Sequence, residues 1–114
     1  MIVGLGIDIV DISRIEEIAK RSPQLISRLP RVNGRSDSAQ DLARDIAIYE
    51  ALYKALPDAE KYDIESYRLF TDPGGRQLVK YMGANFIRKN DYKIFVSISH
   101  EAKLVIACVV LESS

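Results

Sequence analysis

The first run of hydrophobic positions, residues 2–10 (IVGLGIDIV), is rich in β-branched side chains and contains two glycines. A short, continuous apolar run of this kind predicts a buried strand. One polar residue, Asp8, interrupts the run between two isoleucines. An ionised carboxylate is costly to bury unless a charged partner or a metal ion satisfies it. Asp8 is therefore either a capping or ion-pairing residue at the end of a strand or a ligand for a cation.

Helical spacing follows this strand. A helix is expected over Ser13–Lys20, where Asp11 and Ser13 are candidate caps and Ser13 begins the Ser-x-x-Glu spacing of a capping box. The proline that follows ends this helix, and a short helical piece is expected over Pro23–Arg28. Pro30–Ser36 contains an Asn-Gly pair, which is typical of a loop.

The clearest helix is expected over Asp37–Leu56. Ser36 or Asp37 is expected to supply its N-cap, and Pro57 stops it. Hydrophobic residues recur in this segment at spacings of three and four, which predicts one apolar stripe facing the core. The stripe consists of Leu42, Ile46, Tyr49, Tyr53 and Leu56.

The second half of the chain alternates short apolar runs with turns. Asp72–Gly75 (DPGG) is a strong turn signal, so the runs on either side of it are expected to pair as a hairpin. A later hairpin is expected where residues 99–103 separate two β-branched runs. The expected elements are strands over Ile64–Phe70, Arg76–Tyr81, Tyr92–Ser99 and Leu104–Leu111, and a short helix over Gly83–Lys89.

The order of these elements predicts the fold class. One strand, then helices, then two pairs of strands describe an α+β fold, in which a mainly antiparallel sheet packs against one long helix and shorter helices. The chain has 114 residues, which is enough for one domain with a modest core. We therefore expect residues 1–114 to form a single domain.

Composition narrows the classes of function. Sixteen basic and sixteen acidic residues give a formal net charge of zero, so no overall field favours nucleic acid. No apolar run is long enough to span a bilayer. Asp8 and Asp11 interrupt the N-terminal apolar stretch, which also lacks the basic start of a signal peptide. A cytoplasmic location is the resulting expectation. The single cysteine, Cys108, lies in an apolar run and is expected to be a buried small hydrophobe.

Charge is unevenly distributed along the chain. Residues 19–35 contain five basic residues and no acidic one. The segment is either a solvated surface or a docking patch for an acidic partner. The basic residues are Lys20, Arg21, Arg28, Arg31 and Arg35.

Three further residues are candidates for chemistry. Glu50 precedes Lys54 by four positions on the long helix, so the two lie on one helical face, either as a solvated ion pair or as part of a site. His100 is the only histidine and ends an apolar strand where a hairpin turns. Imidazole changes charge near neutral pH, which suits proton transfer or phosphate binding, but a lone surface histidine in a turn is an equal alternative.

The order and context of these residues resemble one family. Gly6–Ile15 (GIDIVDISRI), the helical segment 42–56 (LARDIAIYEALYKAL) and Val96–His100 (VSISH) are similar to the holo-[acyl-carrier-protein] synthases, the small phosphopantetheinyl transferases. The first and third segments carry the strongest resemblance. It implies Mg²⁺-dependent transfer of 4′-phosphopantetheine from coenzyme A to a serine hydroxyl of an apo acyl carrier protein, with release of adenosine 3′,5′-bisphosphate.

The resemblance also implies roles for individual residues. In that family an aspartate of the first strand and a glutamate of the helix ligate Mg²⁺, and they are matched here by Asp8 and Glu50. Lys54 matches a lysine that contacts phosphate and assists proton transfer, so Asp8, Glu50 and Lys54 form the implied catalytic set. His100 matches a histidine that lines the coenzyme A site, and Ser99 is assigned to the same site.

The implied protein partner is the acidic acyl carrier. Arg14 matches the family's carrier-binding arginine, and Arg21 and Arg28 are assigned to the same surface. Family members of this size assemble as trimers with sites between neighbouring subunits, so a homotrimer is implied. A Mg²⁺ ion held by two carboxylates, pyrophosphate and water neutralises charge around the reacting phosphorus. Such an ion would explain why Asp8 stands in an apolar strand.

The chain departs from the family pattern at two positions of the long helix. Asp45 and Tyr49 stand where the family has an arginine and a lysine, which removes positive charge near the pyrophosphate. In one interpretation the chain is an active transferase whose coenzyme A phosphates bind Arg76, Lys80 or an arginine of residues 28–35. In a second, it is a non-catalytic relative that binds an acyl carrier protein or a nucleotide resembling coenzyme A. A third, unrelated interpretation is a small structural or interaction domain without a ligand.

Overall fold

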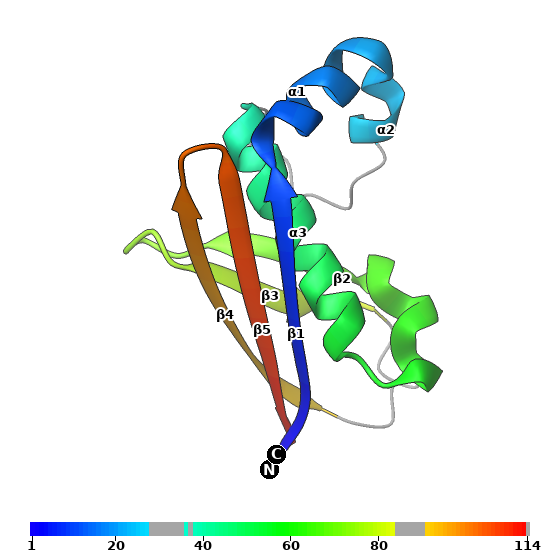
Figure 1. Ribbon diagram of the computed structural model, residues 1–114. Coiled ribbons are helices and arrows are strands. Elements are labelled where there is room, and N and C mark those ends of the chain that lie inside the picture. Colours follow the sequence, from blue (N-terminus) through cyan, green and yellow to red (C-terminus); the bar gives the residue numbers. More distant parts are fainter. Residues whose placement is uncertain (28–35, 37, 84–90, 114) are drawn as a thin grey trace.

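Strands from the two ends of the chain form the central sheet of the structure, which is a computed structural model. β5 (Leu104–Ser113) lies between β1 (Ile2–Asp11) and β4 (Tyr92–Glu101), and both pairings are antiparallel. The two ends of the chain meet at one end of this sheet (Figure 1). The residues that the structure describes are 1–27, 36, 38–83 and 91–113.

Helices lie on one face of this sheet. α3 (Ala39–Ala55) packs along β1 and β5, while α1 (Ile12–Arg21) and α2 (Pro23–Ser27) continue from the end of β1. No helix in the described part of the chain is long and apolar enough to cross a membrane.

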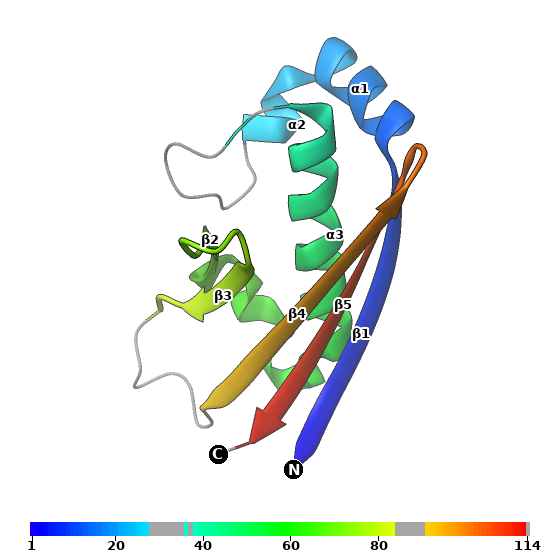
Figure 2. The same ribbon diagram turned by 90° about the vertical axis from the view of Figure 1, so that its left-hand side faces the viewer.

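The remaining elements form a separate hairpin. β2 (Tyr67–Thr71) and β3 (Gln77–Tyr81) pair antiparallel, and the 3₁₀ segment η1 (Asp58–Ser66) joins them to α3. In the turn, the Gly75 N–H donates to the Asp72 carbonyl at 2.9 Å, and Gly75 has a φ of 88°, a conformation that glycine tolerates. Figure 2 shows α3 and this hairpin on the same side of the three-stranded sheet, with no described element on the other side.

The predicted α+β class, a mainly antiparallel sheet against one long helix and shorter helices, is confirmed. Both predicted hairpins form, and β4 and β5 each extend two residues beyond the predicted strand ends. The predicted strand over Ile64–Phe70 starts too early, because residues 58–66 form η1. Apart from Ser36 and Gly83, the predicted loop over Pro30–Ser36 and the predicted helix over Gly83–Lys89 lie outside the described residues.

The prediction that β1 is a buried strand is wrong for one of its faces. Val10 is 8% exposed on the face toward α3, whereas three residues of the opposite face are more than half exposed: Leu5, Ile7 and Ile9. The reason is that side chains alternate along a strand, and only the α3 face is covered. Cys108 of β5 also lies on the uncovered face and is only partly buried, contrary to the predicted core position.

The structure confirms a predicted cap for one main helix and corrects the predicted cap of the other. Of the two candidate caps of α1, Asp11 is the one that is used, because its Oδ1 accepts the Ser13 N–H at 2.8 Å. Ser38 caps α3 by accepting the Asp41 N–H at 3.2 Å, so the helix starts after the predicted Ser36 or Asp37. Asp37 lies outside the described residues.

α3 buries a broader face than the predicted stripe. Leu42, Tyr49 and Leu56 are buried as expected, but Tyr53 is 45% exposed. The buried face is broad because two structures cover it. The sheet covers one part of the helix surface, and the hairpin, to which the Tyr49 hydroxyl donates, covers a neighbouring part. Five further hydrophobic residues of α3 are completely buried: Ala43, Ala47, Ile48, Ala51 and Leu52.

Two glycines of β1 allow the strand to lie directly on the backbone of α3. A Cβ atom at Gly4 would stand 2.0 Å from the Ala55 carbonyl oxygen, and one at Gly6 would stand 1.8 Å from the Ala51 carbonyl oxygen. Real Cβ atoms do not approach backbone oxygens this closely. Any larger residue at either position therefore forces the strand and the helix apart.

We expect Gly6→Ala to lower the melting temperature by at least about 5 °C, because relieving the overlap costs about 1–3 kcal/mol or more. Thermal unfolding followed by circular dichroism measures this change. Gly74→Ala is the matched control, since a Cβ there meets only Asp72 Oδ1 at 3.4 Å, which is an ordinary contact. Equal melting temperatures for the two variants would contradict the close packing of β1 on α3.

Candidate functional site

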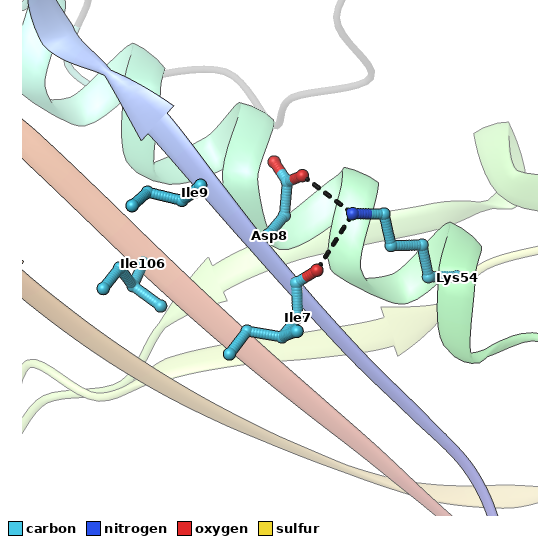
Figure 3. Close-up of a pocket in the computed structure, with 5 residues that line it drawn as sticks. All are labelled: Ile7, Asp8, Ile9, Lys54 and Ile106. Carbon is cyan, nitrogen blue, oxygen red and sulfur yellow. Dashed lines mark hydrogen bonds and ion pairs between the residues drawn. The ribbon is translucent and has the colours of Figure 1, made fainter.

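An ion pair between β1 and α3 forms the centre of the candidate site (Figure 3). Lys54 Nζ donates to Asp8 Oδ1 at 3.1 Å and to the Ile7 carbonyl oxygen at 3.0 Å. The Asp8 side chain is 18% exposed and that of Lys54 is 53% exposed. Asp8 is thus not enclosed by its isoleucine neighbours, which point to the opposite face of the strand. The sequence pattern implied a partner for this carboxylate, and in the structure that partner is Lys54.

An open pocket borders this pair at the edge of β1. Its volume is about 280 Å³, and its wall is mostly apolar. Figure 3 shows the isoleucine side chains on one side of the strand and the Asp8 and Lys54 side chains on the other. The pocket therefore joins the uncovered face of the sheet to the ion pair. Its lining residues are Ile7, Asp8, Ile9, Lys54 and Ile106.

Glu50 lies one helical turn before Lys54 and is exposed. Its carboxylate makes no ion pair or hydrogen bond within the described part of the chain. Gly4 contacts the Ala55 carbonyl and Gly6 contacts the Ala51 carbonyl, so each two-residue step along β1 matches one turn of α3. Continuing this register by one step brings Asp8 to the turn of α3 that precedes Ala51 and contains Glu50.

The chemistry of these donors fits a hard divalent cation. Mg²⁺ prefers oxygen ligands and is often held by one or two carboxylates together with substrate phosphates and water. Among the described residues there is no group of three or more His, Cys, Asp or Glu side chains that would hold a metal by themselves. Asp8 and Glu50 would therefore supply two carboxylates to a site that a phosphate ligand completes.

Three predicted ligand-binding residues lie at or beyond the β4 edge of the sheet, opposite the β1 edge that carries Asp8. His100 and Ser99 belong to β4, which is separated from β1 by β5, a distance of about 10 Å between strand axes. Both are exposed, and as neighbours on a strand they point to opposite faces. Arg76 follows the turn between β2 and β3, and this turn projects beyond β4, away from β1 (Figure 1). Within one chain, these residues do not join Asp8 and Lys54.

Two of the three predicted partner-binding residues lie on α1. Arg14 and Arg21 are both exposed, while Ile12 and Ile15 of the same helix are buried. Neither arginine forms an ion pair with a carboxylate of the described residues. Their charges are thus available to an acidic partner. Arg28 lies outside the described residues.

Comparison with known proteins decides the family. The holo-[acyl-carrier-protein] synthase of Geobacter metallireducens is 36% identical over 124 residues, which cover 98% of this chain and 98% of that protein. This chain belongs to the holo-[acyl-carrier-protein] synthase family. No family model matches the chain.

Solved structures of holo-[acyl-carrier-protein] synthases agree with this membership. The holo-(acyl-carrier-protein) synthase of Bacillus anthracis, in complex with CoA (3′,5′-ADP), is similar at a TM-score of 0.78 and 27% identity, over 100% of this chain and 99% of that chain. The acyl carrier protein synthase of Mycobacterium tuberculosis is similar at a TM-score of 0.73 and 28% identity, over the full length of both chains. The fold is therefore that of a holo-[acyl-carrier-protein] synthase.

The structure assigns a place to Asp45, where the synthase pattern has an arginine. Asp45 is completely buried, and its Oδ1 accepts from Arg44 Nε at 3.0 Å. Arg44 also pairs with Asp41 at 3.2 Å. Asp45 is thus part of an ion network within α3, and Arg44 is held by two carboxylates rather than standing free for a phosphate.

Tyr49 also has a structural role. It is 7% exposed, and its hydroxyl donates to the Tyr67 carbonyl at 2.9 Å. Tyr67 is the first residue of β2, so this bond fastens the start of the hairpin to the middle of α3. Where the synthase pattern has a positively charged lysine, this chain therefore has a buried tyrosine that is hydrogen-bonded to the hairpin.

Sequence reasoning missed the apolar part of the site. Ile7 and Ile9 belong to the strand that was predicted to be buried, and Ile106 was given no role, whereas all three line the open pocket. The available signal was the two-residue period of a strand, because it places Ile7 and Ile9 on the face opposite Asp8. The Ile7 carbonyl, which accepts from Lys54, could not have been identified, because a backbone acceptor leaves no mark in the sequence.

We expect Tyr49→Phe to destabilise the protein by about 1 kcal/mol, because the Tyr67 carbonyl loses one of its two side-chain donors and keeps only Arg68. Chemical denaturation measures the free energy of unfolding. Tyr53→Phe is the control, since the Tyr53 side chain is exposed and its hydroxyl makes no hydrogen bond within the described residues. If both variants were as stable as the wild type, the proposed anchoring role of Tyr49 would be wrong.

Proposed function

We propose that the chain transfers 4′-phosphopantetheine from coenzyme A to a serine hydroxyl of an apo acyl carrier protein and releases adenosine 3′,5′-bisphosphate. The observation that carries the proposal is the Lys54–Asp8 pair, with Glu50 one turn away, in a member of the holo-[acyl-carrier-protein] synthase family. The Bacillus anthracis relative is in complex with CoA (3′,5′-ADP), which supports coenzyme A as the donor. The whole chain acts as one phosphopantetheinyl transferase-like domain in this proposal.

Asp8 and Glu50 are proposed to hold a Mg²⁺ ion together with the pyrophosphate of coenzyme A. When bound, the ion would neutralise negative charge on the phosphate oxygens and orient the leaving group. The carboxylates themselves fix the site, because Asp8 comes from a strand held in the sheet and Glu50 from a helix packed upon it. The strand and the helix would thus hold the two carboxylates near one ion, and no further acidic side chain is needed.

Lys54 is proposed to contact the reacting phosphate. Its ammonium already lies at the rim of the pocket, and its side chain is long and half exposed, so it can reach an oxygen atom there. A positive charge at this point stabilises the negative charge that builds up as the serine hydroxyl attacks. Once its bonds to β1 are broken, the ammonium could donate hydrogen bonds to the phosphate oxygens, and it could take up the hydroxyl proton only after losing one of its own.

Arg14, Arg21 and Arg28 are proposed to bind the acidic surface of the carrier protein. Arg14 and Arg21 lie on the exposed side of α1, which follows β1 directly and therefore lies close to Asp8. Charge attraction of this kind steers association and orients the partner. Docking on α1 would present the carrier serine to the pocket at the edge of β1.

His100, Ser99 and Arg76 are proposed to bind coenzyme A from a neighbouring copy of the chain. Asp8 and Lys54 lie at the β1 edge of the sheet, and His100 lies at the opposite, β4 side. A ring of identical subunits joins one side of each copy to a different side of the next. The β1 side of one subunit would then meet the β4 side of its neighbour, and the two groups of residues would form one shared site in a homotrimer.

The uncovered face of the sheet supports such an assembly. Its apolar side chains are continuous across the strands, because Ile7 lies opposite Cys108 and Ile9 opposite Ile106. Contiguous exposed apolar surface of this kind is typical of protein interfaces. The most exposed members are Leu5, Ile7, Ile9, Phe95, Leu104 and Ile106.

We expect an apo acyl carrier protein to gain the mass of one phosphopantetheine when incubated with this protein, coenzyme A and Mg²⁺. Asp8→Ala should reduce the rate by a factor of about 100 or more, since one ligand of the ion and its charge are lost. Intact-mass spectrometry of the carrier measures both results. Binding of coenzyme A without any mass gain would instead identify a non-catalytic relative. If coenzyme A did not bind at all, both the active transferase and the non-catalytic relative would be excluded.

We expect the wild-type protein to sediment as a trimer at micromolar concentration and Leu5→Asp to sediment as a monomer. The reason is that Leu5 is 65% exposed on the uncovered face, where a buried, unpaired charge would be costly. Tyr62→Asp is the control, because Tyr62 is 71% exposed on η1, away from that face. A wild-type monomer, or loss of the trimer in the Tyr62 variant, would count against a shared interface on the sheet.

A further inference from the structure

Lys54 is the positive group that binds Asp8 in this structure. Its ammonium lies 3.1 Å from Asp8 Oδ1 and 3.0 Å from the Ile7 carbonyl oxygen, so one positive group is held by two oxygens of β1. No other cation of the described residues forms an ion pair with Asp8. A divalent ion that binds the same carboxylate oxygen would stand next to this ammonium and repel it.

The pair is placed so that it can open. The Lys54 side chain is 53% exposed, and water and salt screen an ion pair of this exposure. Its four-carbon stem rotates freely once the ammonium is released. Asp8 is 18% exposed and belongs to a paired strand, so its carboxylate stays in place when the lysine leaves.

We propose that Lys54 is a built-in competitor for the cation at Asp8, and that loading of a divalent ion moves the Lys54 ammonium from β1 toward the bound phosphate. The inference rests on the metal site of the proposed function and adds a second position for the same lysine. In the metal-free protein Lys54 neutralises Asp8, and in the loaded protein the ion takes over that task.

Competition at Asp8 couples the metal to the nucleotide. The ion alone must displace Lys54 without giving its charge a new partner, so it binds weakly. Coenzyme A supplies phosphate oxygens that accept the displaced ammonium, so the ion and the nucleotide strengthen each other's binding. Such coupling is reciprocal by thermodynamic necessity.

The test is Mn²⁺ binding in the absence of coenzyme A, measured from the electron paramagnetic resonance signal of the free ion. We expect Lys54→Met to bind Mn²⁺ about three- to tenfold more tightly than the wild type, because the competing ammonium is gone. Lys54→Arg, which keeps the charge, should show no such gain. Lys93→Met is the matched control, since Lys93 pairs with Glu112 at 4.0 Å on β4 and β5, and its loss changes the net charge equally.

Asp8→Asn separates this inference from the proposed metal site. If Asp8→Asn abolishes Mn²⁺ binding but Lys54→Met binds no more tightly than the wild type, Lys54 is not a competitor and the metal site stands. An equal gain in Lys93→Met would also overturn the inference, because the effect would then be one of net charge. If Asp8→Asn binds Mn²⁺ as the wild type does, both the metal site and the inference fall.

Discussion

The contact between the β1 backbone and the α3 backbone is the constraint on which the site depends. It exists because Gly4 and Gly6 have no side chains, so that carbonyl oxygens of the helix lie where Cβ atoms would otherwise stand. The short distance between strand and helix lets a lysine of the helix reach both a side chain and a carbonyl of the strand. Glycine at these positions is therefore a requirement of the site as much as of the packing.

The same alternation that places Asp8 toward α3 leaves an apolar face on the other side of the sheet. In the proposed function the two edges of the sheet come together between copies of the chain, and this proposal rests on that face and on the separation of Asp8 from His100. A small domain gains from such an arrangement, because sharing apolar surface offsets its high ratio of surface to volume. The site would then be complete only in the assembled protein.

Much of the fold could be predicted from the sequence, because strand and helix periods are local signals. Asp72–Gly75 marked one hairpin and the short link before Leu104 marked the other, and both form. What failed depended on distant parts of the chain: β1 was taken as buried, although nothing covers its second face within the described residues. The catalytic roles of Asp8, Glu50 and Lys54 came from the resemblance to a family. The helical period placed Tyr49 toward the core, but the hydrogen bond from its hydroxyl to Tyr67 and the burial of Asp45 beside Arg44 depend on tertiary contacts that the period does not specify.

The pairing of the first strand with the last has a consequence for how the chain folds. Asp8 lies opposite Ala107, so the central contacts of the sheet join residues nearly a whole chain length apart. Contacts of such high sequence separation form slowly, since a long loop must close before they are gained. During synthesis β1 and α3 are made early, but the part of α3 that packs on β5 remains uncovered until β5 has been made. The sheet partner that holds Asp8 in position beside Lys54 is thus added only when the last strand has been made.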